Sequence, residues 1–309
     1  MMKKAYILGL LGIFMAFAKC SIAQQDPMFS QYMFNTLSIN PAYAGSADML
    51  EVNAIYRHQW VKFDGAPVTQ TLVAHTPLKK ESLSFGGSII NDRHGPVRQT
   101  GIYGDISYRI FMDKSKLSFG LKAGVNLFSA NLQDLNTVVD ADPTFQANVS
   151  NRTLPNFGAG VFWHSERYYI GFSVPKLLTN KLINSDLPDF KDNKERRHAF
   201  LTAGIVLDIN NYLKFKPTLL VKAVDGAPIS FDVTANFLLY EKFWIGAMYR
   251  FEDAMGVLLQ YEVNGKIRVG YAYDYTFSDI GQYSNGSHEI MLGVVFGKRS
   301  GGDISPRYF

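Results

Sequence analysis

Apolar and polar residues alternate along most of this chain, in stretches of about ten residues that recur almost to its end. In the stretch 116–127, one set of alternate positions is apolar and the other is polar or small. The apolar set is Leu117, Phe119, Leu121, Ala123, Val125 and Leu127, and the other set is Lys116, Ser118, Gly120, Lys122, Gly124 and Asn126. Successive side chains of a β-strand point to opposite faces, so this pattern predicts a strand with one apolar and one polar face.

The alternation predicts about fourteen strands, each of about the length that crosses a bilayer at a tilt. Their expected ranges are 51–60, 67–76, 83–92, 98–110, 116–128, 154–164, 168–176, 197–209, 212–224, 228–239, 243–251, 254–263, 266–277 and 287–297. Such a series is typical of an antiparallel transmembrane β-barrel, here an all-β domain over residues 51–297. Within the barrel we expect Leu121 to face lipid and Lys122 to face a wet lumen. Because that position is already wet, we expect Lys122→Leu to be tolerated.

The predicted connections between strands differ in length in a regular way. The longest three, 129–153, 177–196 and 278–286, are the fifth, seventh and thirteenth connections. Odd-numbered connections share one end of an antiparallel barrel, and the even-numbered ones are short, as at the hairpin turn Asn264-Gly265. Outer-membrane barrels have short periplasmic turns and longer external loops, whereas a soluble sandwich has no reason to segregate them.

Glycine and basic residues are frequent on the faces that are predicted to point inward. Arg268 and Gly270 are examples from 266–277, and Gly246 and Arg250 are examples from 243–251. Glycine leaves space, which suits an open channel, a segment threaded through the barrel, or relief of crowding in a tilted strand. These alternatives stay open at the level of the sequence.

The N-terminus has the features of an export signal. Two lysines precede the apolar run 5–18, and Ser21-Ile22-Ala23 fits a cleavage site, so residues 1–23 are expected to be a signal peptide. Lipidation of Cys20, the only cysteine, is the alternative, but Lys19 stands where a small residue is expected. Cleavage lowers the net charge from +4 to +1, because it removes three basic residues and no acidic one. Charge therefore gives no reason to expect nucleic acid as a partner.

Residues 24–50 are expected to form an N-terminal periplasmic or plug segment. Asp26 can cap a helix with Pro27 at its first position, and Asn40-Pro41 would end it. Apolar residues recur at helical spacing at Phe29, Tyr32, Met33 and Leu37. The result would be a short helix or plug at or inside the periplasmic mouth, or a lead-in that only tethers. Residues 298–309 are predicted to be a polar C-terminal tail.

Composition and motifs give little support for catalysis. The hydrophobic content of 47% and the mean hydropathy of −0.04 suit strands that mix lipid-facing and lumen-facing residues. The six histidines have no paired metal-ligand spacing. Asp140 and Asp142 lie in the longest loop, where a solvated loop is favoured over a calcium site. We therefore expect no catalytic residue, no cofactor and no metal, with a lipase-like enzyme as a third hypothesis.

Several long runs of the chain carry a family pattern. They are Gln25-Asp26-Pro27-Met28-Phe29-Ser30-Gln31-Tyr32-Met33-Phe34, Ser38-Ile39-Asn40-Pro41-Ala42-Tyr43-Ala44-Gly45-Ser46, Tyr56-Arg57-His58-Gln59-Trp60, Asp225-Gly226-Ala227-Pro228 and Ser305-Pro306-Arg307-Tyr308-Phe309. With these runs the chain resembles the PorP/SprF family of type IX secretion system membrane proteins over essentially its whole mature length.

The resemblance implies an outer-membrane barrel of a Bacteroidota-type bacterium that helps to export or anchor large surface proteins, such as gliding adhesins. The implied partners are type IX secretion system subunits, a secreted adhesin or its C-terminal domain, and outer-membrane lipid. No catalytic residues come with the family. The alternative function is a passive outer-membrane channel or solute transporter with a wetter lumen.

The family motifs supply the candidate partner-contact residues. They are Asp26, Pro27, Phe29, Ser30, Gln31, Tyr32, Asn40, Pro41, Tyr43, Gly45, Asp64, Gly65, Pro67, Asp225, Gly226 and Pro228. The motif Asp-Gly-Ala-Pro occurs twice, at the first and ninth connections, so both copies are expected on the outer side. The motif is consistent with two turns that need glycine and proline for backbone reasons, or with a pair of rim contacts for a partner.

Overall fold

The computed structural model describes residues 26–78, 82–134, 148–183 and 194–297. The predicted signal peptide with Cys20, the predicted tail 298–309 and the loop residues Asp140 and Asp142 lie outside the described residues.

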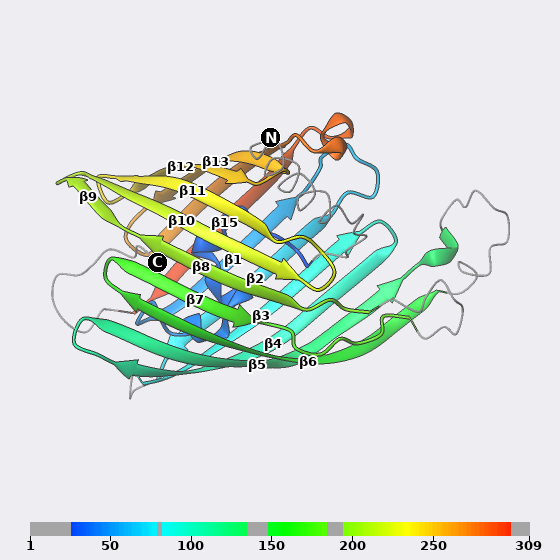
Figure 1. The fold of residues 1–309 in the computed structure, drawn as a ribbon, viewed down its shortest axis with the longest axis horizontal. Coiled ribbons are helices and arrows are strands. Elements are labelled where there is room, and N and C mark those ends of the chain that lie inside the picture. The colour runs from blue at the N-terminus through cyan, green and yellow to red at the C-terminus, as the bar shows by residue number, and fades with distance from the viewer. Residues whose placement is uncertain (1–25, 79–81, 135–147, 184–193, 298–309) are drawn as a thin grey trace, which may run out of the picture.

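Antiparallel strands form one closed barrel with fourteen strand positions (Figure 1). The strands are β1 (Leu50–His58), β2 (Val68–Pro77), β3 (Leu83–His94), β4 (Val97–Phe111), β5 (Ser115–Ala130), β6 (Val149–Ser165), β7 (Tyr168–Val174), β8 (His198–Ile205), β9 (Leu207–Asn210), β10 (Leu213–Val224), β11 (Ser230–Leu239), β12 (Phe243–Arg250), β13 (Ala254–Glu262), β14 (Ile267–Thr276) and β15 (Ser287–Phe296). Pairing of β1 with β15 closes the ring, which removes the free edges that an open sheet would expose.

The predicted all-β barrel is confirmed, and each of the predicted strands has a counterpart. The predicted strand 197–209 is interrupted, because Val206 is buried and its N–H donates to the carbonyl of Arg167 at 2.6 Å. β8 and β9 both pair with β10 and together occupy one strand position. β6 starts five residues earlier than expected, because residues 152 and 153 continue the ladder with β5.

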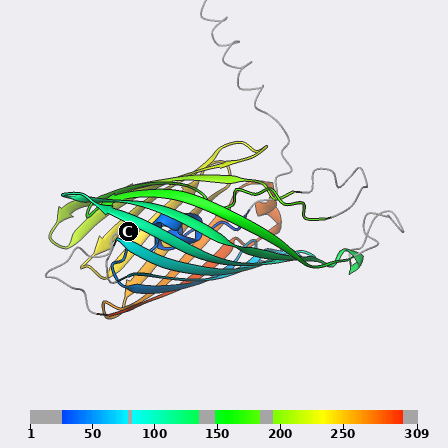
Figure 2. The ribbon, with the colours of Figure 1, turned by 90° about the horizontal axis from the view of Figure 1, so that it is seen from below.

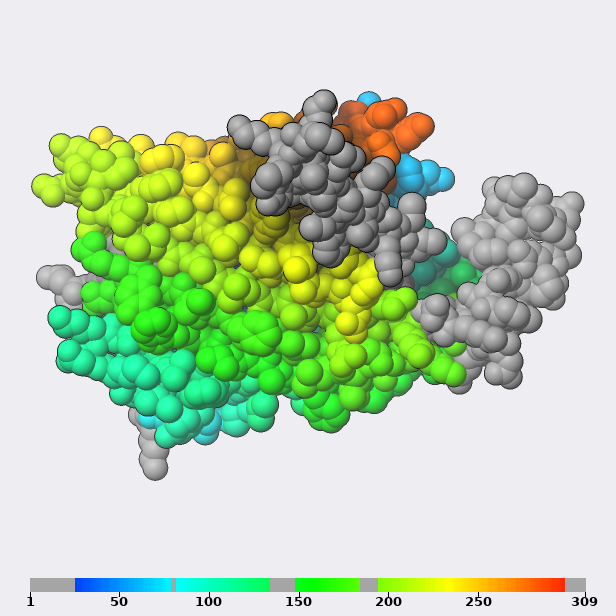
Figure 3. Space-filling view, viewed as in Figure 1, coloured from blue at the N-terminus to red at the C-terminus, as the bar shows by residue number. Residues whose placement is uncertain are grey.

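The barrel has an apolar outer surface and a polar interior, as the alternation predicts. Along β5, Leu121 is 62% exposed on the outside, whereas its neighbour Lys122 is 3% exposed on the inside. Seen from the side, the coloured strands pack into a continuous wall (Figure 3). Among the described residues, no helix is long and apolar enough to cross a bilayer.

The two ends of the barrel differ. Connections 131–148 and 175–197 lie at what we call the long-loop end, toward which β5 and β6 reach farthest in Figure 1. Connections 166–167 and 211–212 lie at the opposite, short-turn end. Short single-turn helices η3 (Leu132–Asp134) and η6 (Asp279–Tyr283) belong to the long-loop end.

Residues 26–49, the lumen arm, lie inside the barrel, as the blue segment of Figure 2 shows. The arm contains three short turns, η1 (Tyr32–Phe34), α2 (Thr36–Ile39) and η2 (Pro41–Tyr43). The expected helix with an Asp26 cap is wrong, because helical structure starts only at residue 32. The backbone N–H groups of Ser30 and Gln31 instead bond to Glu289 of the wall, which replaces helical hydrogen bonds. Asn40 does end α2, as expected.

Candidate functional site

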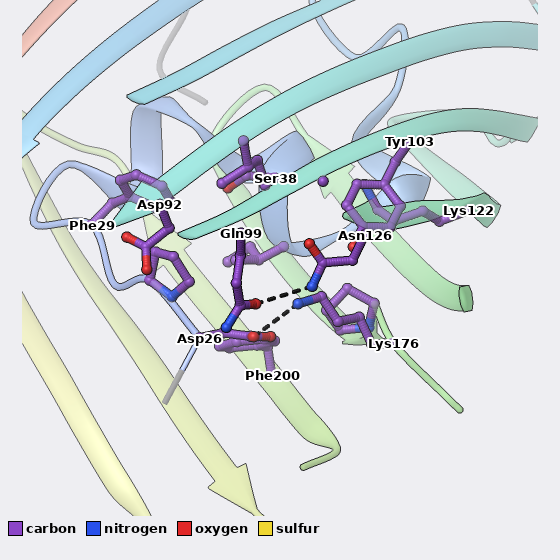
Figure 4. A pocket seen from close by; sticks show the side chains of 15 residues that line it. Asp26, Phe29, Ser38, Asp92, Gln99, Tyr103, Lys122, Asn126, Lys176 and Phe200 are labelled. Carbon is purple, nitrogen blue, oxygen red and sulfur yellow. Dashed lines mark hydrogen bonds and ion pairs between the residues drawn. The ribbon is translucent and has the colours of Figure 1, made fainter. Parts of the chain in front are cut away.

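The lumen arm extends from one end of the barrel to the other, and an ion pair holds each end. At the long-loop end, Asp26 pairs with Lys176 at 2.8 Å, a contact drawn in Figure 4. At the short-turn end, Asp48 pairs with Arg109 at 2.6 Å and with Lys116 at 2.7 Å. Burial alone would raise the pKa of Asp26 and of Asp48, but the neighbouring cations lower both pKa values below the ordinary range. Both carboxylates therefore stay charged at neutral pH.

A buried polar network binds the arm near the long-loop end. Arg57 donates to the hydroxyl of Ser30 at 2.6 Å and also pairs with Asp274 at 2.9 Å and Glu289 at 3.1 Å. Glu289 accepts the backbone N–H groups of Ser30 and Gln31, both at 2.9 Å. Charge-assisted hydrogen bonds are stronger than neutral ones, so this network fixes the position of the motif residues Ser30 and Gln31.

Aromatic contacts hold the middle of the arm. The hydroxyl of Tyr32 lies 2.7 Å from the hydroxyl of Thr218 on β10. Phe34 packs edge-on against Trp244, with ring centroids 5.9 Å apart. The ammonium of Lys216 lies 5.2 Å from the centre of the Phe34 ring. Phe29 and Met33 belong to the same buried cluster.

The second family run of the arm binds the wall near the short-turn end. The side-chain Nδ2 of Asn40 donates to the carbonyl of Val161 at 3.1 Å. The side-chain Oδ1 of Asn40 caps η2, because it accepts the N–H of Ala42 at 3.0 Å. Pro41 occupies the first position of η2, where its missing N–H costs nothing. Tyr43 makes edge-on contacts with His75 and Phe162.

Gly45 is required at the end of this run. Its N–H donates to Nδ1 of His75 at 3.1 Å, and its backbone has φ of +78°. A Cβ at this position would collide with the hydroxyl of Ser84. Left-handed backbone and lack of space both favour glycine.

Glycines in the wall make room for the arm. A Cβ at Gly120 would collide with the backbone of residues 41 and 42, and a Cβ at Gly160 would collide with the side-chain oxygen of Asn40. A Cβ at Gly270 would collide with the side-chain oxygen of Gln31. The sequence left three explanations open for the inward glycines: an open channel, a segment threaded through the barrel, or relief of crowding in a tilted strand. These three positions favour the threaded segment.

Direct cross-strand ion pairs line the lumen wall, and the sequence did not identify them. In the strand register Arg57 faces Glu289, Asp105 faces Lys122, and Asp232 faces Arg250. The Lys122 and Asp105 groups are 3.0 Å apart and both are buried. The expected wet surroundings of Lys122 are therefore wrong, and we now expect Lys122→Leu to destabilise the barrel, because it would leave Asp105 without its buried partner. Alternation identified these residues as inward-facing, but only the register shows which charges meet.

Little space remains between the arm and the wall. One cavity of about 60 Å³ lies between the start of the arm and strands β3 to β5, beside Phe29, Ser38 and Tyr103 (Figure 4). A buried water needs about 10–15 Å³ of such space, so this cavity can hold a small cluster of waters.

The two Asp-Gly-Ala-Pro motifs form the same turn at the long-loop end. The N–H of Ala66 donates to the carbonyl of Phe63 at 3.1 Å, and the N–H of Ala227 donates to that of Val224 at 3.0 Å. The central glycines have φ of +72° at Gly65 and +83° at Gly226, which supports the backbone reason for the motif. The residues Asp64, Gly65, Pro67, Asp225, Gly226 and Pro228 are not brought together, because the β1–β2 and β10–β11 connections lie on opposite sides of the barrel.

A closed barrel with an apolar outer surface and an interior filled by its own N-terminal arm defines an outer-membrane β-barrel of the plugged kind. The chain belongs to the family described as type IX secretion system membrane protein PorP/SprF, whose sequence model matches residues 21–294. Family and fold together indicate the outer membrane and a secretion or channel protein. No curated protein matches the chain.

Solved structures similar to this chain are outer-membrane barrels of low sequence identity. Omp33 of Acinetobacter baumannii has a TM-score of 0.48 at 8% identity, with 80% of this chain and 98% of that chain covered. The CymD monoaromatic hydrocarbon channel has a TM-score of 0.46 at 11% identity, with coverage of 89% and 94%. A Pseudomonas aeruginosa FadL homologue has a TM-score of 0.45 at 13% identity, with coverage of 91% and 95%. Similarity at this level says nothing about what the chain transports or binds.

Within the described residues, no group of three or more histidine, cysteine, aspartate or glutamate side chains is arranged to hold a metal ion. Charged groups inside the barrel are instead paired with one another and with the arm. Of these groups, Arg57, Asp274 and Glu289 bond directly to the arm.

Proposed function

We propose that this barrel works with type IX secretion system subunits to export or anchor a cell-surface protein, such as a gliding adhesin, through contacts at its long-loop end. The observation that carries the proposal is the filled lumen: among the described residues, the arm from Phe29 to Gly45 and most inward-facing side chains are buried, which argues against a wide path for a polypeptide or solute. From Phe29 to Gly45 the arm residues of the family motifs are buried against the wall, and Asp26 and Pro27 are half-buried, whereas Asp64 and Asp225 are exposed at the rim. Rim contacts with the partner are therefore proposed for the two Asp-Gly-Ala-Pro turns.

The proposal includes an orientation and an export signal. Long loops of outer-membrane barrels lie outside the cell, so we place the long-loop end outside and the short-turn end in the periplasm. Residues 1–23 are proposed to be the signal peptide, which after cleavage leaves a chain without cysteine.

A matched pair of cysteine variants tests this orientation. Tyr283 in η6 is 70% exposed at the long-loop end, and Tyr240 between β11 and β12 is 68% exposed at the short-turn end. A membrane-impermeant maleimide should label Tyr283→Cys on intact cells, and should label Tyr240→Cys only after lysis. The unsubstituted protein should stay unlabelled throughout. The reverse pattern would mean that the barrel is inverted, and labelling of the unsubstituted protein would mean that Cys20 is retained.

The secretion role is tested by shortening one long connection. Lys181 and Lys194 form a β-bridge at its base, and Leu182 is buried, so a deletion of residues 184–193 leaves these base contacts intact. We expect this deletion to lower the amount of a specific surface protein, as loss of the whole gene should. Protease treatment of intact cells followed by mass spectrometry of the released peptides measures the effect.

Retention of the barrel fold is checked by its heat-dependent shift on a gel. If loss of the gene leaves the surface proteins unchanged but alters the uptake of small solutes, the channel alternative replaces the secretion proposal. If gene loss removes the surface protein but the loop deletion does not, the partner does not depend on this loop.

A further inference from the structure

A polar row crosses the lipid-facing side of the barrel at the long-loop end. Its members point outward from neighbouring strands, and they are Arg93 on β3, Arg98 on β4, Ser129 on β5 and Asn151 on β6. Arg93 faces Arg98 in the β3–β4 register, and Arg98 faces Ser129 in the β4–β5 register. The N–H of Asn151 donates to the Ser129 hydroxyl at 3.1 Å, so the row is continuous.

The row lies beyond the apolar band of the barrel, from which the outward polar residues Asn91 and Thr100 separate it on β3 and β4. On the same outward faces, the exposed apolar side chains nearest to it are Ile89 on β3, Ile102 on β4 and Leu127 on β5. The outward residues therefore change from apolar to polar at this level of all three strands. This change marks the depth at which a bilayer passes from acyl chains to headgroups.

The two arginines of the row lack an anionic partner among the described residues. Like charges directly opposite each other on adjacent strands destabilise a sheet, and an arginine cannot lose its proton. Among residues 26–78, 82–134, 148–183 and 194–297, neither Arg93 nor Arg98 has a carboxylate within ion-pair distance. Asp64 lines the same region of the rim, but it too forms no ion pair with them.

A hollow of about 720 Å³ lies beside the arginines. Besides Arg93 and Arg98, its polar lining includes the hydroxyl of Ser129 and the amides of Asn131 and Asn151. Guanidinium groups bind phosphate through two parallel hydrogen bonds, and amide and hydroxyl groups suit the hydroxyls of a sugar. The hollow combines both kinds of group on a surface that faces lipid.

We propose that this hollow, lined by Arg93, Arg98, Ser129 and Asn151, binds the phosphorylated saccharide headgroup of a lipid in the leaflet at the long-loop end. A phosphate of the headgroup bridges the two arginines and removes their mutual repulsion. The acyl chains of the same molecule lie along the apolar side chains below. This inference depends on the barrel and its outward face. Because Asp64 and Gly65 also line the hollow, the headgroup would lie beside the first Asp-Gly-Ala-Pro turn, which is proposed to contact the secretion partner.

Native mass spectrometry of the purified full barrel, released from detergent, tests the site. The probes are bisphosphorylated lipid A, the same lipid with its phosphates removed, and inorganic phosphate. The double variant Arg93→Gln/Arg98→Gln should bind bisphosphorylated lipid A more weakly by about tenfold per arginine, since each loses a hydrogen bond to a charged group. Arg197→Gln is the matched control, because Arg197 lies at the same end but is already paired with Asp225 at 3.2 Å.

The expected result is binding of bisphosphorylated lipid A to the unsubstituted protein and to Arg197→Gln, with weak binding of the dephosphorylated lipid. Equal binding by the double variant would overturn the proposal, and so would equal binding of the dephosphorylated lipid. If inorganic phosphate alone occupied the arginines as tightly as the lipid, the site would be one for a free anion and the lipid assignment would fail. The gel shift on heating shows that each variant remains folded.

Discussion

A leucine at position 120 should turn the closed barrel into an open channel. A side chain there would occupy the space of the backbone at Pro41 and Ala42, which cannot shift by rotating a bond. β5 is held by ladders on both sides, whereas η2 is a single turn, so the arm rather than the wall should move. Displacement of the arm should open a wide lumen. Barrels of eight strands are filled by their own side chains and those of 16–18 strands leave an aqueous channel, and the fourteen strand positions here are closer to the second class.

The measurement is ion current across a planar bilayer. Gly120→Leu should conduct in steps, while the unsubstituted protein should stay at the leak of the bare membrane. Gly104→Leu is the matched control, because Gly104 faces outward on the adjacent strand β4 and its nearest neighbour would lie 4.0 Å from the new Cβ. A folded Gly120→Leu barrel that stays closed would contradict the role of the arm as the plug.

A second variant changes the arm and leaves the wall unaltered. Asn40→Ala with Tyr43→Ala removes the cap of η2, the bond to Val161 and the packing on Phe162. Losing a cap costs about 1 kcal/mol and truncating a buried aromatic side chain about 3–5 kcal/mol. This variant should conduct ions, as we expect of Gly120→Leu. It tests the role of the arm independently, because it adds no side chain to the wall and so does not depend on the folding of Gly120→Leu.

The strands could be predicted from the sequence because a barrel wall imposes a strict two-residue period. Each wall residue faces either lipid or lumen, so Leu121 and Lys122 could be assigned to opposite faces without knowing any neighbour. The break at Val206 could not be predicted in this way. It arises from a hydrogen bond to Arg167 in a distant turn. Val206 falls on the inward-facing set between the outward residues Ile205 and Leu207, and one apolar residue at an inward position does not by itself indicate a break.

The path of the arm could not be predicted, because its partners are far away in the sequence. Ser30 binds Arg57, Asp274 and Glu289, the last of which is 259 residues away. Helical spacing at Phe29 to Leu37 suggested one continuous helix, yet the wall accepts the N–H groups that such a helix would need internally. Hydrophobic periodicity reports burial, and in this arm burial comes from a surrounding barrel rather than from one apolar surface.

The inward glycines could have identified the lumen as an occupied space only if their neighbours had been known. Gly120 and Gly160 face each other in the β5–β6 register, and both lie against the same short run of the arm, Gly120 against the backbone of Pro41 and Ala42 and Gly160 against the side chain of Asn40. In the sequence these glycines lie forty positions apart, within ordinary alternating strands. The register is therefore the information that separates a channel from a plugged barrel.

Leu121→Arg should strongly impair insertion of the barrel, because it places a charge on the lipid-facing side in the middle of β5. Leu121 is 62% exposed there, and an arginine at the bilayer midplane costs about 2–4 kcal/mol on the lipid-facing side of a barrel, falling to about 0–1 kcal/mol near the interface. Gln70→Arg is the matched control, since Gln70 faces outward on β2 beside the long-loop end. The equilibrium constant for folding into lipid vesicles, measured by urea titration with the heat-dependent gel shift as readout, should fall by about thirtyfold or more for Leu121→Arg, because each 1.4 kcal/mol changes the equilibrium constant about tenfold. Equal folding of the two variants would mean that this surface of the barrel does not face lipid.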